Sequence, residues 1–167
     1  MVPLRIKGFF LDHDRMPVAV LSDSAGERLL PVWVGPAEAC AMIAELQQIR
    51  SPHHPHAHDV LARYFQRHGF VMDHLEIYAQ RAEEGYCARI RYHRRWRHYR
   101  MEVRASDGLA LAVRLKAPIL AAQGLLGGAD YRPLLGFLHD PSRGLPLAWS
   151  ADERADGGRC PRTAPLN

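Results

Sequence analysis

A strand is predicted to pass without a loop into an apolar helix in the stretch VRASDGLALAVR, residues 103–114. Ser106 is a preferred N-cap residue, and Asp107 in the first helical turn suits the positive end of the helix dipole. One interpretation is that these two residues only stabilise the start of the helix. The other is that, together with Arg104, they form one corner of an active site. The residues of this stretch by themselves leave both interpretations open.

The same arrangement occurs earlier in the chain, in the stretch RLLPVWVGPAEA at residues 28–39. Pro36 is suited to the first position of a helix, and Glu38 falls in the first helical turn. We therefore expect a strand that leads directly into a helix to be used twice in the fold.

The pattern of apolar residues predicts two similar halves. In the first half, strands are expected at residues 4–10, 17–21 and 28–34, followed by helices at residues 36–50 and from the capping residue Asp59 to Gly69. In the second half, strands are expected at residues 70–78, 86–93 and 97–104, followed by helices at residues 106–116 and 118–124. The order β-β-β-α-α therefore occurs twice. It predicts an α+β fold in which helices flank a mixed, largely antiparallel sheet.

With 167 residues, of which 47% are apolar, the chain fits one globular domain. We expect this domain at residues 1–126, and a Pro- and Gly-rich, partly flexible extension at residues 127–167. No apolar run approaches the roughly 20 residues that span a bilayer, and no signal-like segment follows the N-terminus, so we expect a soluble, cytoplasmic protein. The three cysteines, Cys40, Cys87 and Cys160, share no metal-ligand or redox spacing and are expected to be reduced thiols.

Positive charge is concentrated in the two strands predicted between residues 86 and 104. Seven arginines fall between Arg89 and Arg104 against one acid, Glu102, although the net charge of the whole chain is only +4. Alternation along both strands predicts one core face and one basic face, and Trp96 near the turn could stack on a base. Such a surface favours a nucleic-acid partner, and the alternative is a solvated face that keeps an edge strand soluble. The candidate nucleic-acid-binding residues are Arg89, Arg91, Arg94, Arg95, Trp96, Arg97 and Arg100.

Four histidines lie close together in a short tract, at His53, His54, His56 and His58. Histidine tracts can bind divalent metals, but Pro52 and Pro55 hold this segment extended and no cysteine accompanies it. We therefore favour an ordinary loop over a metal site here.

Three separated segments resemble the bifunctional nuclease domain family. They are residues 30–39, the region that contains Ser51-Pro52 and His58-Asp59, and residues 104–118. The resemblance covers about residues 1–125, and it implies a mixed α+β fold built from two β-β-β-α-type repeats, with DNase and RNase activity. For this fold we expect a barrel-like sheet. The chain departs from the common family pattern at Ala57, Ala105 and Gly108, where Thr, Pro and Ala are usual.

The resemblance also implies a set of site residues, and these are Glu38, His58, Asp59, Arg104, Ser106 and Asp107. In a metal-assisted cleavage of phosphodiester bonds, Asp59 and Asp107 would hold Mg²⁺ or Mn²⁺ and His58 would act as general base or acid. Arg104 would then bind the phosphate, and Ser106 would position the corner. The sequence lacks the Gly-x-Ser-x-Gly, phosphate-loop and dinucleotide-binding motifs of other enzyme classes.

Two further classes of function stay open. One is a non-catalytic regulatory module that holds an anion, a nucleic acid or a partner on the same fold. The other is a subunit of a structural homo-oligomer.

Overall fold

The first half of the chain forms an antiparallel meander followed by two helices. A computed structural model describes residues 1–12, 14–49, 56–81, 85–127 and 146–150. The meander consists of β1 (Val2–Leu11), β2 (Pro17–Ser22) and β3 (Leu29–Trp33), and the helices are α1 (Pro36–Leu46) and α2 (Ala57–Arg67). Pro36 occupies the first turn of α1, as expected from its fixed backbone angle. The predicted strands and helices of this half are therefore confirmed, except that α1 ends at Leu46, four residues before the expected end at Arg50.

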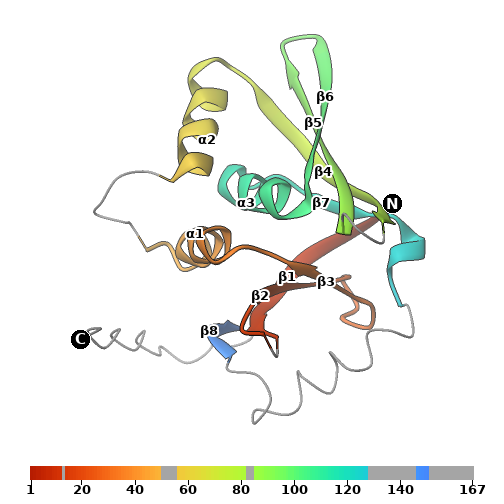
Figure 1. Ribbon diagram of the computed structural model, residues 1–167. Helices are drawn as coiled ribbons and strands as arrows, with labels where there is room; N and C mark the ends of the chain where they lie inside the picture. The colour runs from red at the N-terminus through yellow and green to blue at the C-terminus, as the bar shows by residue number, and fades with distance from the viewer. Residues whose placement is uncertain (13, 50–55, 82–84, 128–145, 151–167) are drawn as a thin grey trace.

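The second half contains a long three-stranded meander and one helix. Its elements are β4 (Val71–Arg81), β5 (Gly85–Arg94), β6 (Arg97–Arg104) and α3 (Ala105–Leu115). Gly69, expected to end the preceding helix, has a left-handed backbone with φ +69° directly after that helix. Strand β6 passes into α3 without a loop, as the sequence predicts (Figure 1).

The prediction of a short helix at residues 118–124 is wrong. Strand β7 (Ile119–Ala121) and one 3-10 turn (Gln123–Leu125) take its place. Ile119 pairs with Leu4 of β1 on one side and with Leu75 of β4 on the other, so β7 joins the two meanders into one sheet. Pairing with β1 and β4 holds these residues in a strand, although their sequence pattern favours a helix. The second half therefore does not repeat the β-β-β-α-α order.

The sheet is mixed and mostly antiparallel, in the order β3-β2-β1-β7-β4-β5-β6. Only the β4–β7 pair is parallel among the described strands. The expectation of a barrel is wrong, because β3 and β6 stand at opposite ends of this order and are not paired with each other in the described part of the chain. The α+β class itself is confirmed.

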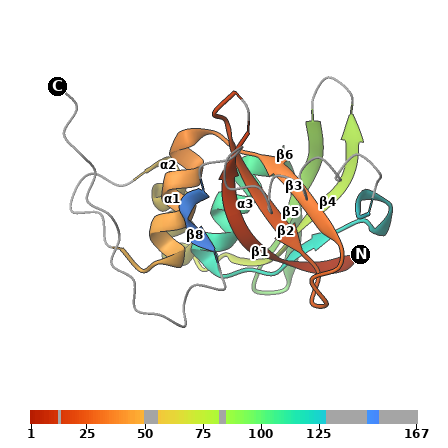
Figure 2. The same ribbon diagram turned by 90° about the horizontal axis from the view of Figure 1, so that it is seen from below.

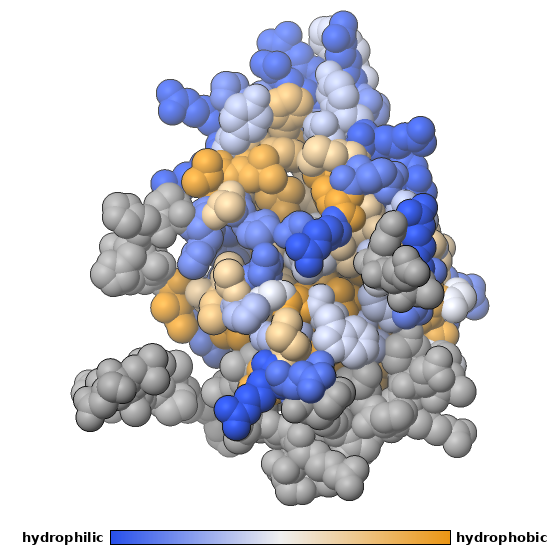
Figure 3. Space-filling view, in the orientation of Figure 1, coloured by the Kyte–Doolittle hydropathy of each residue, from blue (hydrophilic) through white to orange (hydrophobic). Residues whose placement is uncertain are grey.

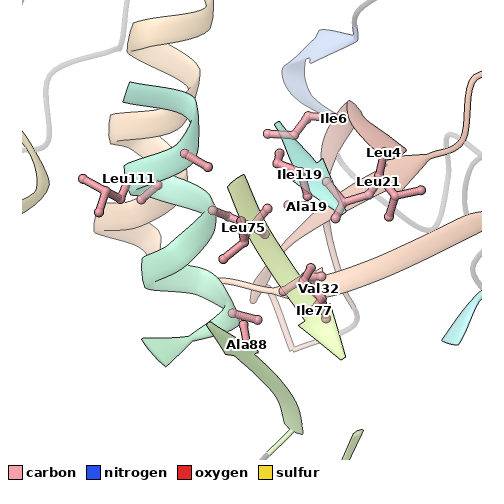
Figure 4. Packing of buried hydrophobic residues seen from close by; sticks show 14 of the residues in the cluster. Leu4, Ile6, Ala19, Leu21, Val32, Leu75, Ile77, Ala88, Leu111 and Ile119 are labelled. Carbon is pink, nitrogen blue, oxygen red and sulfur yellow. The ribbon is translucent and has the colours of Figure 1, made fainter. Parts of the chain in front are cut away.

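Helix α3 lies at the centre of the molecule and packs against β4 and β5, with α1 and α2 as its neighbours (Figures 1 and 2). One core cluster joins all three helices to the sheet, and Leu75 of β4 lies next to α3 in it (Figure 4). Gly108 permits this close approach. A Cβ atom at Gly108 would lie 2.5 Å from Leu75 Cδ1, so the usual Ala would require the Leu75 side chain to shift.

The C-terminal extension contributes a strand to the sheet. Strand β8 (Pro146–Ser150) pairs with β1 antiparallel, with Ser150 opposite Gly8 and Pro146 opposite Phe10. The division into a domain at 1–126 and an extension at 127–167 stays a prediction. Cys40 and Cys87 are free thiols, whereas Cys160 lies outside the described residues. So do Ser51, Pro52 and the histidines His53 and His54.

Candidate functional site

Helix α3 begins one to two residues earlier than the sequence predicted. Arg104 is the N-cap, Ala105 is the first helical residue, and Ser106 and Asp107 follow within the first turn. The expected N-cap role of Ser106 is therefore wrong, because its backbone is already helical and it is only 5% exposed. Asp107 does lie in the first turn, where its carboxylate complements the helix dipole.

Helix α2 also begins before the residue expected to cap it. His56 is the N-cap, and Asp59 lies three residues later. The Asp59 carboxylate bonds back to the start of its own helix, since the backbone N–H of His56 donates to Asp59 Oδ2 over 3.1 Å. Asp59 thus stabilises the helix start from inside the first turn, in the manner of a capping box.

The two helix starts meet. His58 Nε2 lies 3.5 Å from Asp107 Oδ1, and the side chains are 19% and 38% exposed. These residues are 49 positions apart in the sequence, and the packing of α2 against α3 brings them together. The structure therefore places two of the expected site residues in contact, with one edge open to solvent. We refer to His58, Asp59 and Asp107, together with Arg114 described next, as the helix corner.

Arg114 is part of the helix corner, although the sequence did not single it out. Its Nε lies 2.9 Å from Asp59 Oδ1, and its Nη1 donates to Glu45 of α1. One guanidinium on α3 therefore ties α1 and α2 together. Arg114 stands seven residues after Asp107, about two helical turns, so both lie on the same side of α3. The seven-residue spacing between Asp107 and Arg114, within residues 103–114, is the sequence signal that could have identified Arg114.

Glu38 and Arg104 are less closely connected to the corner. Glu38 lies in the first turn of α1, and its carboxylate packs over Gly35. Arg104 is exposed at the junction of β6 and α3. Within the described residues, neither side chain has a hydrogen bond or ion pair with His58, Asp59 or Asp107.

The helix corner does not fit the Mg²⁺ or Mn²⁺ site implied by the family resemblance. Both oxygens of Asp59 are engaged, one by Arg114 and one by the backbone of His56. Mg²⁺ requires near-octahedral oxygen ligands at about 2.0–2.1 Å, usually including one or two free carboxylates. In the described part of the chain, neither Asp59 nor Asp107 belongs to a group of three side chains close enough to share a metal ion. The chemistry considered below therefore uses the side chains alone.

The outer face of the β5–β6 hairpin, which faces away from the helices, is less uniformly basic than its sequence indicates. Strand β4 places Glu76 beside it, and this carboxylate contacts both Arg89 and Arg91. Burial raises the pKa of the Glu76 carboxyl. Hydrogen bonds from His74 and Arg89 and the charges of Arg91 and Arg89 outweigh that effect and lower the pKa to about 2. Two of the seven candidate nucleic-acid-binding residues are thus already paired.

The remaining candidates of the hairpin are exposed. Trp96 in the turn is 77% exposed, and Arg94, Arg95, Arg97 and Arg100 surround it in the sequence and are also exposed. Hydrophilic side chains cover this end of the molecule (Figure 3). The Arg94 guanidinium lies over the Phe70 ring, 5.5 Å from its centroid. An exposed indole beside several exposed guanidinium groups is suited to phosphate contacts and base stacking.

The opposite face of the hairpin is core only over part of its length. Ala88 and Ile90 are buried, whereas Tyr99 and Met101 are 37% and 39% exposed. Tyr99 stacks on Tyr92, with ring centroids 5.2 Å apart. The expected core face therefore ends before the tip, and an aromatic patch continues from it.

Known proteins share sequence similarity with this chain. The sequence model of the bifunctional nuclease domain matches residues 19–132. Two uncharacterized proteins, from two strains of Mycobacterium tuberculosis, are each 28% identical to this chain over 130 residues. Each alignment covers 77% of this chain and 76% of the relative.

Among the described residues, no helix is both long and apolar enough to cross a membrane.

The matched region begins within β2 and contains the rest of both meanders, the helix corner and the whole β5–β6 hairpin. The family indicates a nuclease-like or nucleic-acid-binding role. On this match, the chain belongs to the bifunctional nuclease domain family.

Proposed function

We propose that this protein is a nuclease that cleaves phosphodiester bonds in DNA, RNA or both, with low sequence specificity. The observation that carries the proposal is the contact between His58 and Asp107 in a chain of the bifunctional nuclease domain family. A histidine held by a carboxylate at a partly exposed surface is a common arrangement for general acid–base catalysis.

The chemistry follows from the orientation of the imidazole. When His58 Nε2 carries the proton and faces the Asp107 carboxylate 3.5 Å away, the neutral ring has its lone pair on Nδ1, and that nitrogen can accept a proton from water or from a ribose hydroxyl. The Asp107 carboxylate then stabilises the imidazolium that forms. General acid–base catalysis of this kind contributes about 10²- to 10⁴-fold to a rate.

Binding of the substrate is assigned to the exposed arginines of the hairpin and to Arg104. Strand β6 runs from the hairpin turn to the helix corner, and Arg100 and Arg104 lie on the same face of it because they are four residues apart. Strand β6 ends the described strand order, so a nucleic-acid backbone that follows this edge of the sheet from the hairpin turn would reach the start of α3, where Asp107 lies. Contacts to phosphates carry no sequence information, which accounts for the low specificity that we propose.

A second candidate function is nucleic-acid binding without cleavage. The engagement of both Asp59 oxygens favours it, because a closed ion-pair network resembles a structural support more than a reaction centre. The two candidates differ only in turnover, so one assay separates them.

The assay uses the purified full chain with fluorescently labelled single- and double-stranded DNA and RNA. We expect cleavage that falls at least 100-fold in His58→Ala while binding measured by anisotropy is retained. His68→Ala, an exposed histidine at the end of the same helix, is the matched control and should cleave normally. Cleavage that persists unchanged in His58→Ala would mean a contaminating nuclease or another site. Binding without turnover in the wild type would establish the second candidate instead.

A further inference from the structure

Three side chains with metal-ligating atoms gather on the outer face of the sheet, away from the helix corner. They are Asp73 of β4, His93 of β5 and His98 of β6, and one ligand atom of each lies within 4.8 Å of the others. His93 Nδ1 is 2.6 Å from Asp73 Oδ1, and His98 Nδ1 is 3.9 Å from Asp73 Oδ2. No second group of this kind occurs in the described part of the chain.

Local backbone features bring these side chains together. His93 and His98 are direct partners in the β5–β6 ladder, one pair inward from the hairpin turn. Asp73 lies at a register shift of β4 between Met72 and His74, as in a β-bulge. Such an irregularity adds a residue to one strand and re-aims its side chain, and it is often found next to functional sites. Val71 pairs with His93, so alternation from Val71 places Asp73 on the same face, and the shift then leaves Asp73 and His74 both on it.

We propose that Asp73, His93 and His98 form a binding site for a borderline divalent cation of the Zn²⁺ class. Tetrahedral Zn²⁺ binds nitrogen and carboxylate oxygen at about 2.0–2.1 Å, which places neighbouring ligand atoms about 3.4 Å apart. His93 is 2.6 Å from one Asp73 oxygen and His98 is 3.9 Å from the other, so side-chain rotations would have to bring the three ligand atoms to that spacing around one ion. Two imidazole ligands select Zn²⁺ and similar ions over Mg²⁺ and Ca²⁺, which prefer oxygen.

Three protein ligands leave the fourth tetrahedral position for water or an anion. A surface pocket lies at this place, and its lining includes Asp73 and His98 together with Arg91 and Arg100. Glu76 also lines this pocket and pairs with Arg91, so Arg100 is the guanidinium that would contact a metal-bound oxyanion such as phosphate. The site uses none of the residues assigned to proton transfer above. Cation binding here can therefore be tested independently of the proposed nuclease activity.

The test is a titration of the full chain with Zn²⁺, followed by calorimetry and by thermal melting. We expect one Zn²⁺ per chain bound by this site and a rise in the melting temperature, because a ligand that binds only the folded state stabilises it. His98→Ala should weaken this binding at least tenfold. His98 is 74% exposed, so this variant is expected to fold, and an unchanged melting temperature without metal checks it. Asp73→Asn should also weaken binding.

The histidine tract is the competing metal site, and the triple variant His53→Ala/His54→Ala/His56→Ala is the matched control. Under the proposal, the triple variant retains the Zn²⁺ site, and Co²⁺ in place of Zn²⁺ gives a tetrahedral absorption spectrum that His98→Ala abolishes. Zn²⁺ affinity that is unchanged in His98→Ala, or that disappears in the triple variant, would overturn the proposal. Asp73, His93 and His98 would then be a hydrogen-bonded surface cluster only.

Discussion

Arg91 and Arg100 lie directly opposite each other in the β5–β6 ladder, but their surroundings differ. Arg91 Nε is 3.3 Å from Glu76 Oε1, whereas no carboxylate of the described residues forms an ion pair with Arg100. Like charges opposite each other in a ladder are unfavourable unless a counter-ion is present. Glu76 supplies that counter-ion on one side only, which leaves Arg100 available for an external anion.

This asymmetry predicts which arginine binds nucleic acid more strongly. Arg100→Ala should lower the affinity for unrelated DNA and RNA sequences to a similar extent and reduce the salt slope by about one unit, as for one lost phosphate contact. Arg91→Ala should have a smaller effect, because its charge is already shared with Glu76. Fluorescence anisotropy at several salt concentrations measures both quantities. An unchanged slope in Arg100→Ala would identify the hairpin face as merely solvated.

The low pKa of Glu76 predicts a pH dependence of stability. A carboxyl group whose folded-state pKa is depressed contributes stability above its unfolded pKa, and this contribution is lost as the pH falls toward the folded value. For Glu76 the window runs from about pH 4.5 down to about pH 2. Urea unfolding of Glu76→Gln should show a deficit against wild type at pH 6 that shrinks across this window.

The control for this experiment is Glu27→Gln, in the exposed turn between β2 and β3. Its stability should follow that of the wild type throughout the same pH range. A Glu76→Gln deficit that stays constant down to pH 2 would show that packing, and not charge, is what the side chain contributes.

Arg114 is predicted to stabilise the packing of the three helices. Arg114→Met keeps most of the aliphatic side chain but leaves Asp59 and Glu45 without their shared cation, and it should cost about 1–3 kcal/mol. Arg63→Met, on the exposed surface of α2, should cost less than about 0.5 kcal/mol. Urea denaturation compares the two. Equal effects would mean that the Arg114 network is worth no more than a surface ion pair.

The same variant tests the metal assignment of Asp59. If Arg114 is what keeps a divalent cation from this carboxylate, Arg114→Met should bind Mn²⁺ more tightly than the wild type. Unchanged, weak Mn²⁺ binding would argue against Asp59 as a metal ligand in any state of the protein.

The pairing of β8 with β1 predicts how far the chain can be shortened. A chain that ends after Ser150 retains this pairing and should melt like the full-length protein. A chain that ends after Gly127 loses β8 and the ladder bonds to β1, and it should be less stable by about 1–3 kcal/mol. Thermal melting of both shortened chains and of the full-length protein measures these differences. A loss of cooperativity on removal of residues 151–167 would mean that this segment belongs to the core.

The sequence predicted those features of the fold that are local. Alternation identified the six long strands, and Pro36 and Gly69 marked helix ends, because these signals act within a few residues. Strand β7 escaped prediction because its three residues acquire their conformation from pairing with Leu4 and Leu75, which are distant in the chain. The sequence also did not predict that the sheet stays open and does not form a barrel, because this too depends on which distant strands pair.

The candidate site was predicted in part for a similar reason. His58 and Asp107 were both identified from their motifs, but their contact depends on how α2 packs on α3. The partners supplied by other elements were missed. Arg114 closes the network at Asp59, and Glu76 and Asp73 bring negative charge from β4 to a hairpin whose own sequence reads as basic.

Asp107 is the residue at which stabilisation of a helix and catalysis make opposite predictions. Asp107→Asn keeps the size of the side chain and removes its charge. If Asp107 only complements the dipole of α3, the change should cost about 0.3–1 kcal/mol and leave nuclease activity intact. If it holds His58 for proton transfer, activity should fall at least 100-fold while the melting temperature moves by only a few degrees.

A double-mutant cycle then separates joint from independent action of the two residues. When two side chains act as one unit, removing the second costs little more than removing the first. His58→Ala/Asp107→Asn should therefore be about as inactive as His58→Ala alone, although losses from independent sites would multiply. Multiplicative losses, or an Asp107→Asn protein with full activity, would exclude the His58–Asp107 pair as the proton-transfer unit. Asp107 would then be a dipole-stabilising residue of α3, and the reaction would have to be sought at another part of the surface.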